Sequence, residues 1–157
     1  MNSKSKFAIG VLGLAILVLS SAKNSCAAPP TDACSLLTPA QVTSVLDIPA
    51  TPGHLDPADK TVCHWPFTGL AGVLNSKKGV EVKLLDANSW SMLEPAIAAG
   101  ESVTGVGDNA TYFGPSRLTT LVIERGNVRF EVTVSGVPLD QVKAKEKTLA
   151  KDILAKL

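Results

Sequence analysis

Residues 118–135 read as a β-hairpin, and this segment constrains the fold more strongly than any other part of the sequence. Residues 118–124 and 128–135 alternate between apolar and polar side chains on either side of Arg125-Gly126-Asn127. A loop of Arg125-Gly126 or of Gly126-Asn127 assigns the side chains to the same faces, so both registers remain open. One face collects the apolar side chains Leu121, Ile123, Val128, Phe130, Val132 and Val134. Helices have to cover this face, because it would otherwise leave a large apolar patch in water.

The first of three predicted helices has a clear start. Thr38 and Gln41 form a capping box, and Pro39 occupies the first helical position. Proline is tolerated there because the N–H that it lacks would have no partner within the helix. The helix is predicted to end near Asp47, ahead of Pro49.

Two further helices are predicted from apolar side chains at helical spacing. Residues 88–99 form the middle helix, which Gly100 ends. Because Pro95 interrupts it, its start stays open between Ser89 and Glu94. Its periodic apolar positions are Trp90, Leu93 and Ile97. Residues 139–157 form an amphipathic C-terminal helix with lysines on its polar side. Its apolar side consists of Leu139, Val142, Leu149, Ile153 and Leu157.

Three shorter segments, residues 61–67, 80–84 and 110–113, are predicted to be strands, and residues 50–60 a loop. Alternation places Cys63, Trp65 and Phe67 on one face of the first strand, with Val62, His64 and Pro66 on the other. The order of elements predicts an α+β fold. It consists of a single antiparallel sheet of about 4–6 strands with an N-terminal, a middle and a C-terminal helix packed on it.

The N-terminus has the organisation of a secretory signal peptide. Lys4 and Lys6 precede the apolar run of residues 7–19, and small residues follow. The run is too short for a membrane-spanning helix, which needs about 20 residues. Cleavage is predicted after Ala22 or after Ala27. We assign residues 1–27 to the signal peptide, residues 28–33 to a linker and residues 34–157 to a single domain. This domain is exported, to the periplasm or the extracellular space.

The chain has 3 cysteines, an unusual number for an exported protein. Cleavage after Ala27 removes Cys26 and leaves Cys34 and Cys63, which are predicted to form a disulfide in an oxidising compartment. A membrane-anchored lipoprotein, modified at Cys26, is the alternative and leaves the same pair. The residues before Cys26, Lys23-Asn24-Ser25, differ from those that usually precede a lipid-modified cysteine.

The charge of the mature domain excludes one class of partner. Loss of Lys4, Lys6 and Lys23 with the signal peptide leaves 12 basic and 14 acidic residues, a net charge of −2. The basic patch of a nucleic-acid-binding protein is missing. We expect a monomer without a membrane span after signal cleavage.

Known catalytic patterns are missing or stand in the wrong context. Adjacent strand residues point to opposite faces, so Cys63 and His64 do not converge on a metal with His54, nor form a Cys–His nucleophile. Residues 105–108 ("GVGD") resemble a phosphate loop, but no helix follows, since Gly114-Pro115 breaks the chain. No serine lies in a nucleophile-elbow motif. We therefore predict no catalytic residues, no metal and no cofactor.

Several segments together resemble small bacterial secreted or lipoprotein domains of unknown function. These segments are "CSLLT" from Cys34, "CHW" from Cys63, "GVGDNATYF" from Gly105 and the hairpin that follows. The chain departs from the family pattern at Gln41, where an acid is usual, and at Asp47, where a glycine often ends the first helix. The resemblance implies an envelope or extracellular α+β domain of the PsbP-like type with its two cysteines paired, and it brings no catalytic residues.

The expected function is binding without catalysis, with an envelope protein or a small ligand as the partner. Small clefts between a sheet and its helices are common ligand sites. We expect the contact region in residues 105–115 beside the hairpin, with Asp108, Asn109 and Tyr112 as its ligand- or partner-binding residues. The alternative is a small envelope hydrolase that uses His64 and Asp108 as acid and base.

Overall fold

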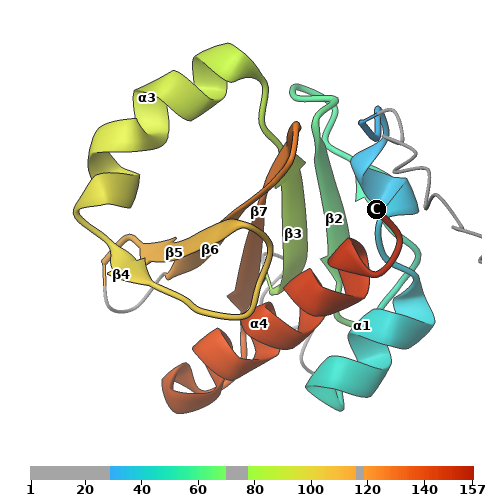
Figure 1. Ribbon diagram of the computed structural model, residues 1–157. Coiled ribbons are helices and arrows are strands. Elements are labelled where there is room, and N and C mark those ends of the chain that lie inside the picture. Colours follow the sequence, from blue (N-terminus) through green and yellow to red (C-terminus); the bar gives the residue numbers. More distant parts are fainter. Residues whose placement is uncertain (1–28, 70–77, 116–118) are drawn as a thin grey trace, which may run out of the picture.

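The computed structural model describes residues 29–69, 78–115 and 119–157. The predicted signal peptide, Cys26 and the first residue of the predicted hairpin, Leu118, lie outside the described residues. Within that part of the chain, one seven-stranded antiparallel sheet lies between helices on both of its faces (Figure 1). The α+β prediction is confirmed.

Seven strands follow one another across the sheet. Their order is β1 (His54–Leu55), β2 (Val62–Pro66), β3 (Gly79–Leu84), β7 (Val128–Ser135), β6 (Thr120–Arg125), β5 (Asn109–Phe113) and β4 (Glu101–Ser102). The prediction of 4–6 strands missed the two outermost ones, β1 and β4. Each has only two residues, too few to show a period in the sequence. The segment 50–60, predicted as a loop, therefore contains an edge strand.

The predicted hairpin is the centre of the sheet, and its register is now resolved. Arg125 pairs with Val128, so Gly126-Asn127 is the two-residue loop. Gly126 has a φ of 57° and Asn127 a negative one, which is typical of a type II′ turn. The apolar face is buried as predicted, and Leu121, Ile123, Phe130 and Val132 have no exposed surface.

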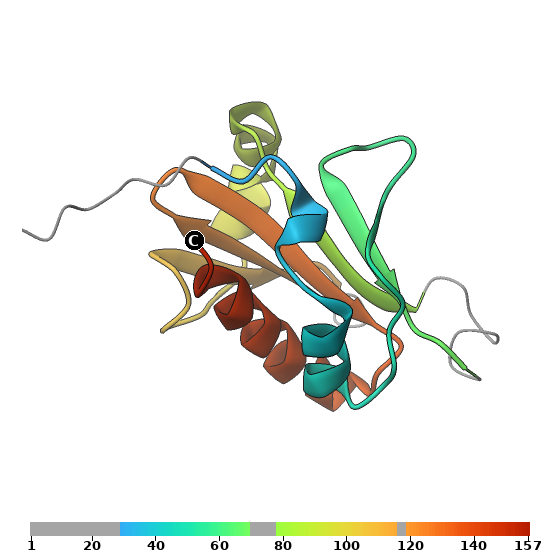
Figure 2. The same cartoon turned by 90° about the vertical axis from the view of Figure 1, so that its right-hand side faces the viewer.

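Helices α1 (Pro39–Leu46) and α4 (Leu139–Leu154) cover this apolar face (Figure 2). The capping box of α1 is formed as predicted. Asp47 follows the helix with a φ of 58°, in the left-handed region that glycine usually occupies. Two lysines of the C-terminal segment hold the N-terminal segment on α4. Lys145 donates to the carbonyl of Val45, and Lys156 donates to the carbonyl of Leu36.

The buried side of α4 differs from the prediction at two positions. Leu139 was assigned to the apolar side, but 57% of its surface is exposed at the first turn of the helix. Glu146 is completely buried against the sheet. Its Oε1 accepts a hydrogen bond from the backbone N–H of Val134 at 3.0 Å, close to the point where the neighbouring strand β6 begins.

The predicted disulfide joins the short 3₁₀ helix η1 (Ala33–Ser35) to β2. The Cα atoms of Cys34 and Cys63 lie 5.1 Å apart. Trp65 and Phe67 share the buried face of this strand with Cys63, as the alternation predicted. The bond places the N-terminal segment of the described chain over the sheet, and such bonds are typical of proteins in oxidising compartments.

Helix α3 (Ala87–Ala98) lies on the opposite face of the sheet from α4 (Figure 1). It begins at Ala87, ahead of the predicted start between Ser89 and Glu94, because Pro95 stands inside the helix without ending it. The guanidinium of Arg129 on β7 lies 4.7 Å from the centre of the Trp90 ring. The helix buries none of its side chains. Among the described residues, no helix is both long enough and apolar enough to span a membrane.

Candidate functional site

The predicted contact region begins with a loop, residues 103–108, between β4 and β5. Backbone hydrogen bonds close it at both ends, from Val103 to Ala110 and from Asp108 to Glu124. Val106 is 2% exposed and anchors the loop in the core. Gly105 and Gly107 have φ values of 75° and 60°, which the turn requires and which side chains other than glycine rarely adopt.

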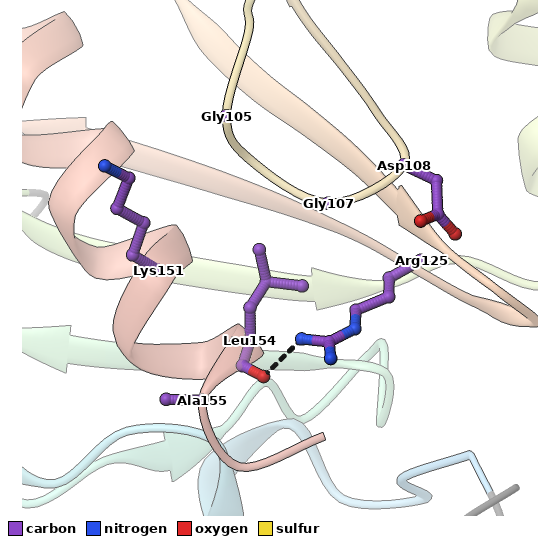
Figure 3. A pocket seen from close by; sticks show the side chains of 7 residues that line it. All are labelled: Gly105, Gly107, Asp108, Arg125, Lys151, Leu154 and Ala155. Atoms are coloured by element: carbon purple, nitrogen blue, oxygen red, sulfur yellow. Dashed lines mark hydrogen bonds between the residues drawn. The ribbon is translucent and has the colours of Figure 1, made fainter. Parts of the chain in front are cut away.

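A hollow of ≈ 480 Å³ lies between this loop and the C-terminal end of α4 (Figure 3). We call it the loop–helix hollow. The residues that line it are Gly105, Gly107, Asp108, Arg125, Lys151, Leu154 and Ala155. Figure 3 shows Arg125 and Lys151 on either side of the Leu154 side chain, so the hollow has an apolar centre between two cations.

The two cations of the loop–helix hollow have unused hydrogen-bond donors. Arg125 donates from Nη1 to the carbonyl of Leu154 at 2.7 Å, which satisfies a carbonyl in the last turn of α4. Its Nε and Nη2 donors have no partner among the described residues, and neither does the ammonium of Lys151. Both side chains are exposed, so a ligand can reach them.

Asp108 is the acidic member of the hollow. Its Oδ2 accepts a hydrogen bond from the backbone N–H of Gly126 at 2.7 Å. The carboxylate therefore ties the loop to the hairpin turn, and it is already engaged in the free protein. Its charge partly offsets the charges of Arg125 and Lys151.

The three predicted site residues do not converge. The side-chain amide of Asn109 donates to Oε2 of Glu124 on the other face of the sheet. Tyr112 is 7% exposed, and its hydroxyl donates to the carbonyl of Lys143 on α4. Burial raises the pKa of Tyr112 to about 12, with smaller contributions from the charges of Glu146 and Glu101. Of the three, only Asp108 lines the loop–helix hollow.

Sequence reasoning missed Arg125 and Lys151. The sequence predicts Arg125 only as part of a turn, and Lys151 only as one of the lysines on the polar side of a helix. They lie 26 positions apart in the sequence, and only the packing of α4 on the sheet brings them together. An arginine that directly precedes a two-residue turn was the one local signal available.

His64 lies at the other end of the sheet with two carboxylates. Its Nε2 is 3.2 Å from Oδ2 of Asp56, and its Nδ1 is 3.3 Å from Oε2 of Glu81. Backbone hydrogen bonds from Ala58 and Asp59 lower the pKa of Asp56, and the bond to His64 lowers it further. Within the described part of the chain, no three potential ligands gather around a metal position.

The acid–base pair of the hydrolase alternative is not assembled. Strands β3, β7 and β6 lie between β2, which carries His64, and β5, which Asp108 precedes. Neighbouring strands are about 4.8 Å apart, so the two residues are separated by roughly 15 Å or more. No single substrate bond can contact both groups at this separation.

The two glycines of the loop differ in the space around them, which predicts different costs of substitution. A Cβ at Gly107 would stand 2.5 Å from the carbonyl oxygen of Glu124, which accepts the hydrogen bond from Asp108. A Cβ at Gly105 would have no atom within 4 Å beyond its neighbours in the chain. We expect Gly105→Ala to cost about 1 kcal/mol from its positive φ alone, and Gly107→Ala to cost clearly more. Thermal unfolding of the two variants measures the difference, and equal losses would contradict the assigned loop geometry.

The loop–helix hollow contains cationic donors and glycine backbone, and the described residues that line it include no cysteine, serine or histidine. Donors of this kind are able to contact an anionic group. Comparison of the chain with family models, curated proteins and solved structures finds no match. The resemblance to bacterial exported domains stays a prediction.

Proposed function

We propose that the mature protein is an exported, non-enzymatic binding domain of the cell envelope that recognises an acidic peptide segment of a partner protein at the loop–helix hollow. The observation that carries this proposal is the pair of exposed cations, Arg125 and Lys151, which lie on either side of one hollow with donors unused by the fold. Neither cation forms an ion pair among the described residues.

The shape of the donor set favours carboxylates. The Nε and Nη2 donors of an arginine form a planar fork that matches both oxygens of a carboxylate. Lys151 supplies a second, flexible positive charge from α4. The open space around Gly105 allows a peptide to approach the backbone of the loop closely.

The electrostatics favour a partner protein over a small free anion. Asp108 and the C-terminal end of α4 both add negative potential to the hollow, so its net attraction for an anion is modest. The cations are also exposed, whereas a small-molecule site usually encloses its ligand. An acidic peptide can add contacts outside the hollow and so compensate for a weak contact inside it.

Lys151→Gln is expected to weaken the binding of an acetylated tetraglutamate peptide about threefold to tenfold, since it removes one charge contact. Fluorescence anisotropy of the labelled peptide at low salt measures the affinity. Lys147→Gln is the matched control, because it removes one charge from the same helix without touching the hollow. Lys151 makes no side-chain contact that the fold requires, so this variant should retain its stability.

A tetraglutamine peptide should not bind, and added salt should weaken the tetraglutamate complex. Equal losses in the two lysine variants would show attraction to net charge alone and would contradict the proposed site. Failure of the peptide to bind the unmodified protein at millimolar concentration would overturn the proposal.

A further inference from the structure

Helix α3 is too apolar for its position in the fold. Among its twelve residues, Glu94 is the one charged side chain, yet none of the twelve is buried. Helices that are apolar around most of their circumference are normally buried. The other two helices of the described chain follow this rule, since α1 and α4 each bury several side chains.

Two apolar stripes run along α3. Trp90, Leu93 and Ile97 form the first, and they are half-buried on the side of the sheet. Met92, Ala96 and Ala99 form the second at spacings of four and three residues, which places them on one face of the helix. All three are exposed, and 76% of the surface of Met92 is accessible to solvent.

The second stripe leads into a hollow at the C-terminal end of the helix. This hollow has a volume of ≈ 580 Å³, and Ala96 and Ala99 line it on the helix side. Phe113 and Tyr112 of β5 add aromatic surface to it, and the ion pair of Lys143 with Glu101 stands beside them. Such a hollow can accept one large apolar side chain, the usual anchor of a protein interface.

The charged side chains that residues 86–101 contribute to this surface all have the same sign. Asp86 at the N-cap, Glu94 on the helix and Glu101 after it are acidic, and residues 86–101 contain no lysine or arginine. The nearest cations are already paired. Arg129 contacts Glu124 at 2.8 Å, and Lys143 contacts Glu101 at 2.6 Å. Glu101 is neutralised by Lys143, whereas Asp86 and Glu94 form no ion pair among the described residues, so the unpaired charges beside the exposed stripe are negative.

We propose that the exposed stripe of α3 and the hollow at its end form a docking surface for a partner segment that combines an apolar anchor with lysine or arginine side chains. Its chemistry is opposite to that of the loop–helix hollow, and the two hollows share no lining residue. Asp86 at the start of α3 and Glu94 within it repel an anionic membrane surface. They also repel the same surface of a second copy in a symmetric dimer.

Fluorescence anisotropy of a labelled peptide tests this surface directly. A labelled amphipathic peptide of lysine and leucine should bind with a saturating rise in anisotropy. Met92→Lys should weaken this peptide about tenfold or more, because it places a charge at the centre of the stripe. Ser91→Lys makes the same charge change one position away and should have a much smaller effect. Lys151→Gln should have no effect, so this surface and the proposed peptide site can fail independently.

Four outcomes would overturn the proposal. The first is equal binding to the Met92→Lys and Ser91→Lys variants, and the second is equal binding of a glutamate–leucine peptide. The third is a preference for phosphatidylglycerol vesicles over the peptide, which would assign the surface to a membrane. The fourth is concentration-dependent dimerisation that Met92→Lys abolishes, which would assign it to a second copy.

Discussion

Replacing Glu146 with glutamine is expected to raise the free energy of unfolding substantially at pH 8.5 and to change it little at pH 5. Glu146 is completely buried, and its Oε2 has no hydrogen-bond partner among the described residues. Burial raises the pKa of Glu146 to about 8, although the hydrogen bond from Val134 and the charge of Lys143 oppose this shift. The folded protein therefore keeps the proton of Glu146 over a range of pH in which the unfolded chain has lost it.

The direction of the pH effect follows from this difference. Below pH 4.5 both states hold the proton, and the stability contributed by the protonated side chain is fully present. As the pH rises towards 8, the unfolded state gains the charge freely while the folded state does not, so the free energy of unfolding falls. Once the pH is high enough for the folded state to lose the proton as well, the free energy of unfolding is lower by about 3–5 kcal/mol than it is below pH 4.5. Glutamine still accepts from Val134 and does not titrate, so the variant loses this dependence.

Chemical denaturation at pH 5, 6.5 and 8.5 measures the effect. Burial also raises the pKa of Glu131, but this residue is present in both proteins, so its contribution cancels in the comparison. Glu94→Gln, an exposed substitution on α3, is the control and should leave the free energy of unfolding unchanged at each pH. Parallel pH profiles for the unmodified protein and Glu146→Gln would contradict a buried, protonated Glu146.

Removal of the disulfide is expected to lower the free energy of unfolding by about 3–4 kcal/mol, because the bond closes a loop of this length in the unfolded chain. Cys34 and Cys63 are separated by 29 positions. Cys63 is completely buried beside Trp65 and Phe67, so its replacement also removes packing in the core. The double variant Cys34→Ala/Cys63→Ala avoids a free thiol.

Denaturant unfolding of the oxidised protein, the reduced protein and the double variant separates the two contributions. Reduction should destabilise the unmodified protein and leave the double variant unchanged. An unchanged midpoint of unfolding after reduction would contradict the disulfide that joins η1 to β2.

Local sequence signals predicted the elements well where the physical cause is itself local. The capping box of Thr38 and Gln41 and the alternation around Gly126 depend on residues within a few positions of one another. Asp47 shows the limit of such signals, because its left-handed conformation requires the context of the helix end. The edge strands β1 and β4 were missed because their hydrogen-bond partners, and not their own composition, make them strands.

The candidate site was harder to predict because it depends on tertiary packing. Asp108 was identified from its glycine-rich loop, whereas Arg125 and Lys151 meet only when α4 lies across the sheet. Tyr112 was expected at a contact surface, but its hydroxyl is used in holding α4. The amphipathic pattern of α4 did not distinguish Glu146, a buried acid, from the lysines around it.

The claim that the loop–helix hollow is the binding site is tested most directly by an NMR titration of the ¹⁵N-labelled protein with the tetraglutamate peptide. We predict saturating shifts of the backbone amides of Gly105 and Gly107 and of the Nε–H of Arg125, with no shifts around His64 or along α3. Shifts concentrated at His64 or along α3, or none at all with the peptide in large excess, would contradict it.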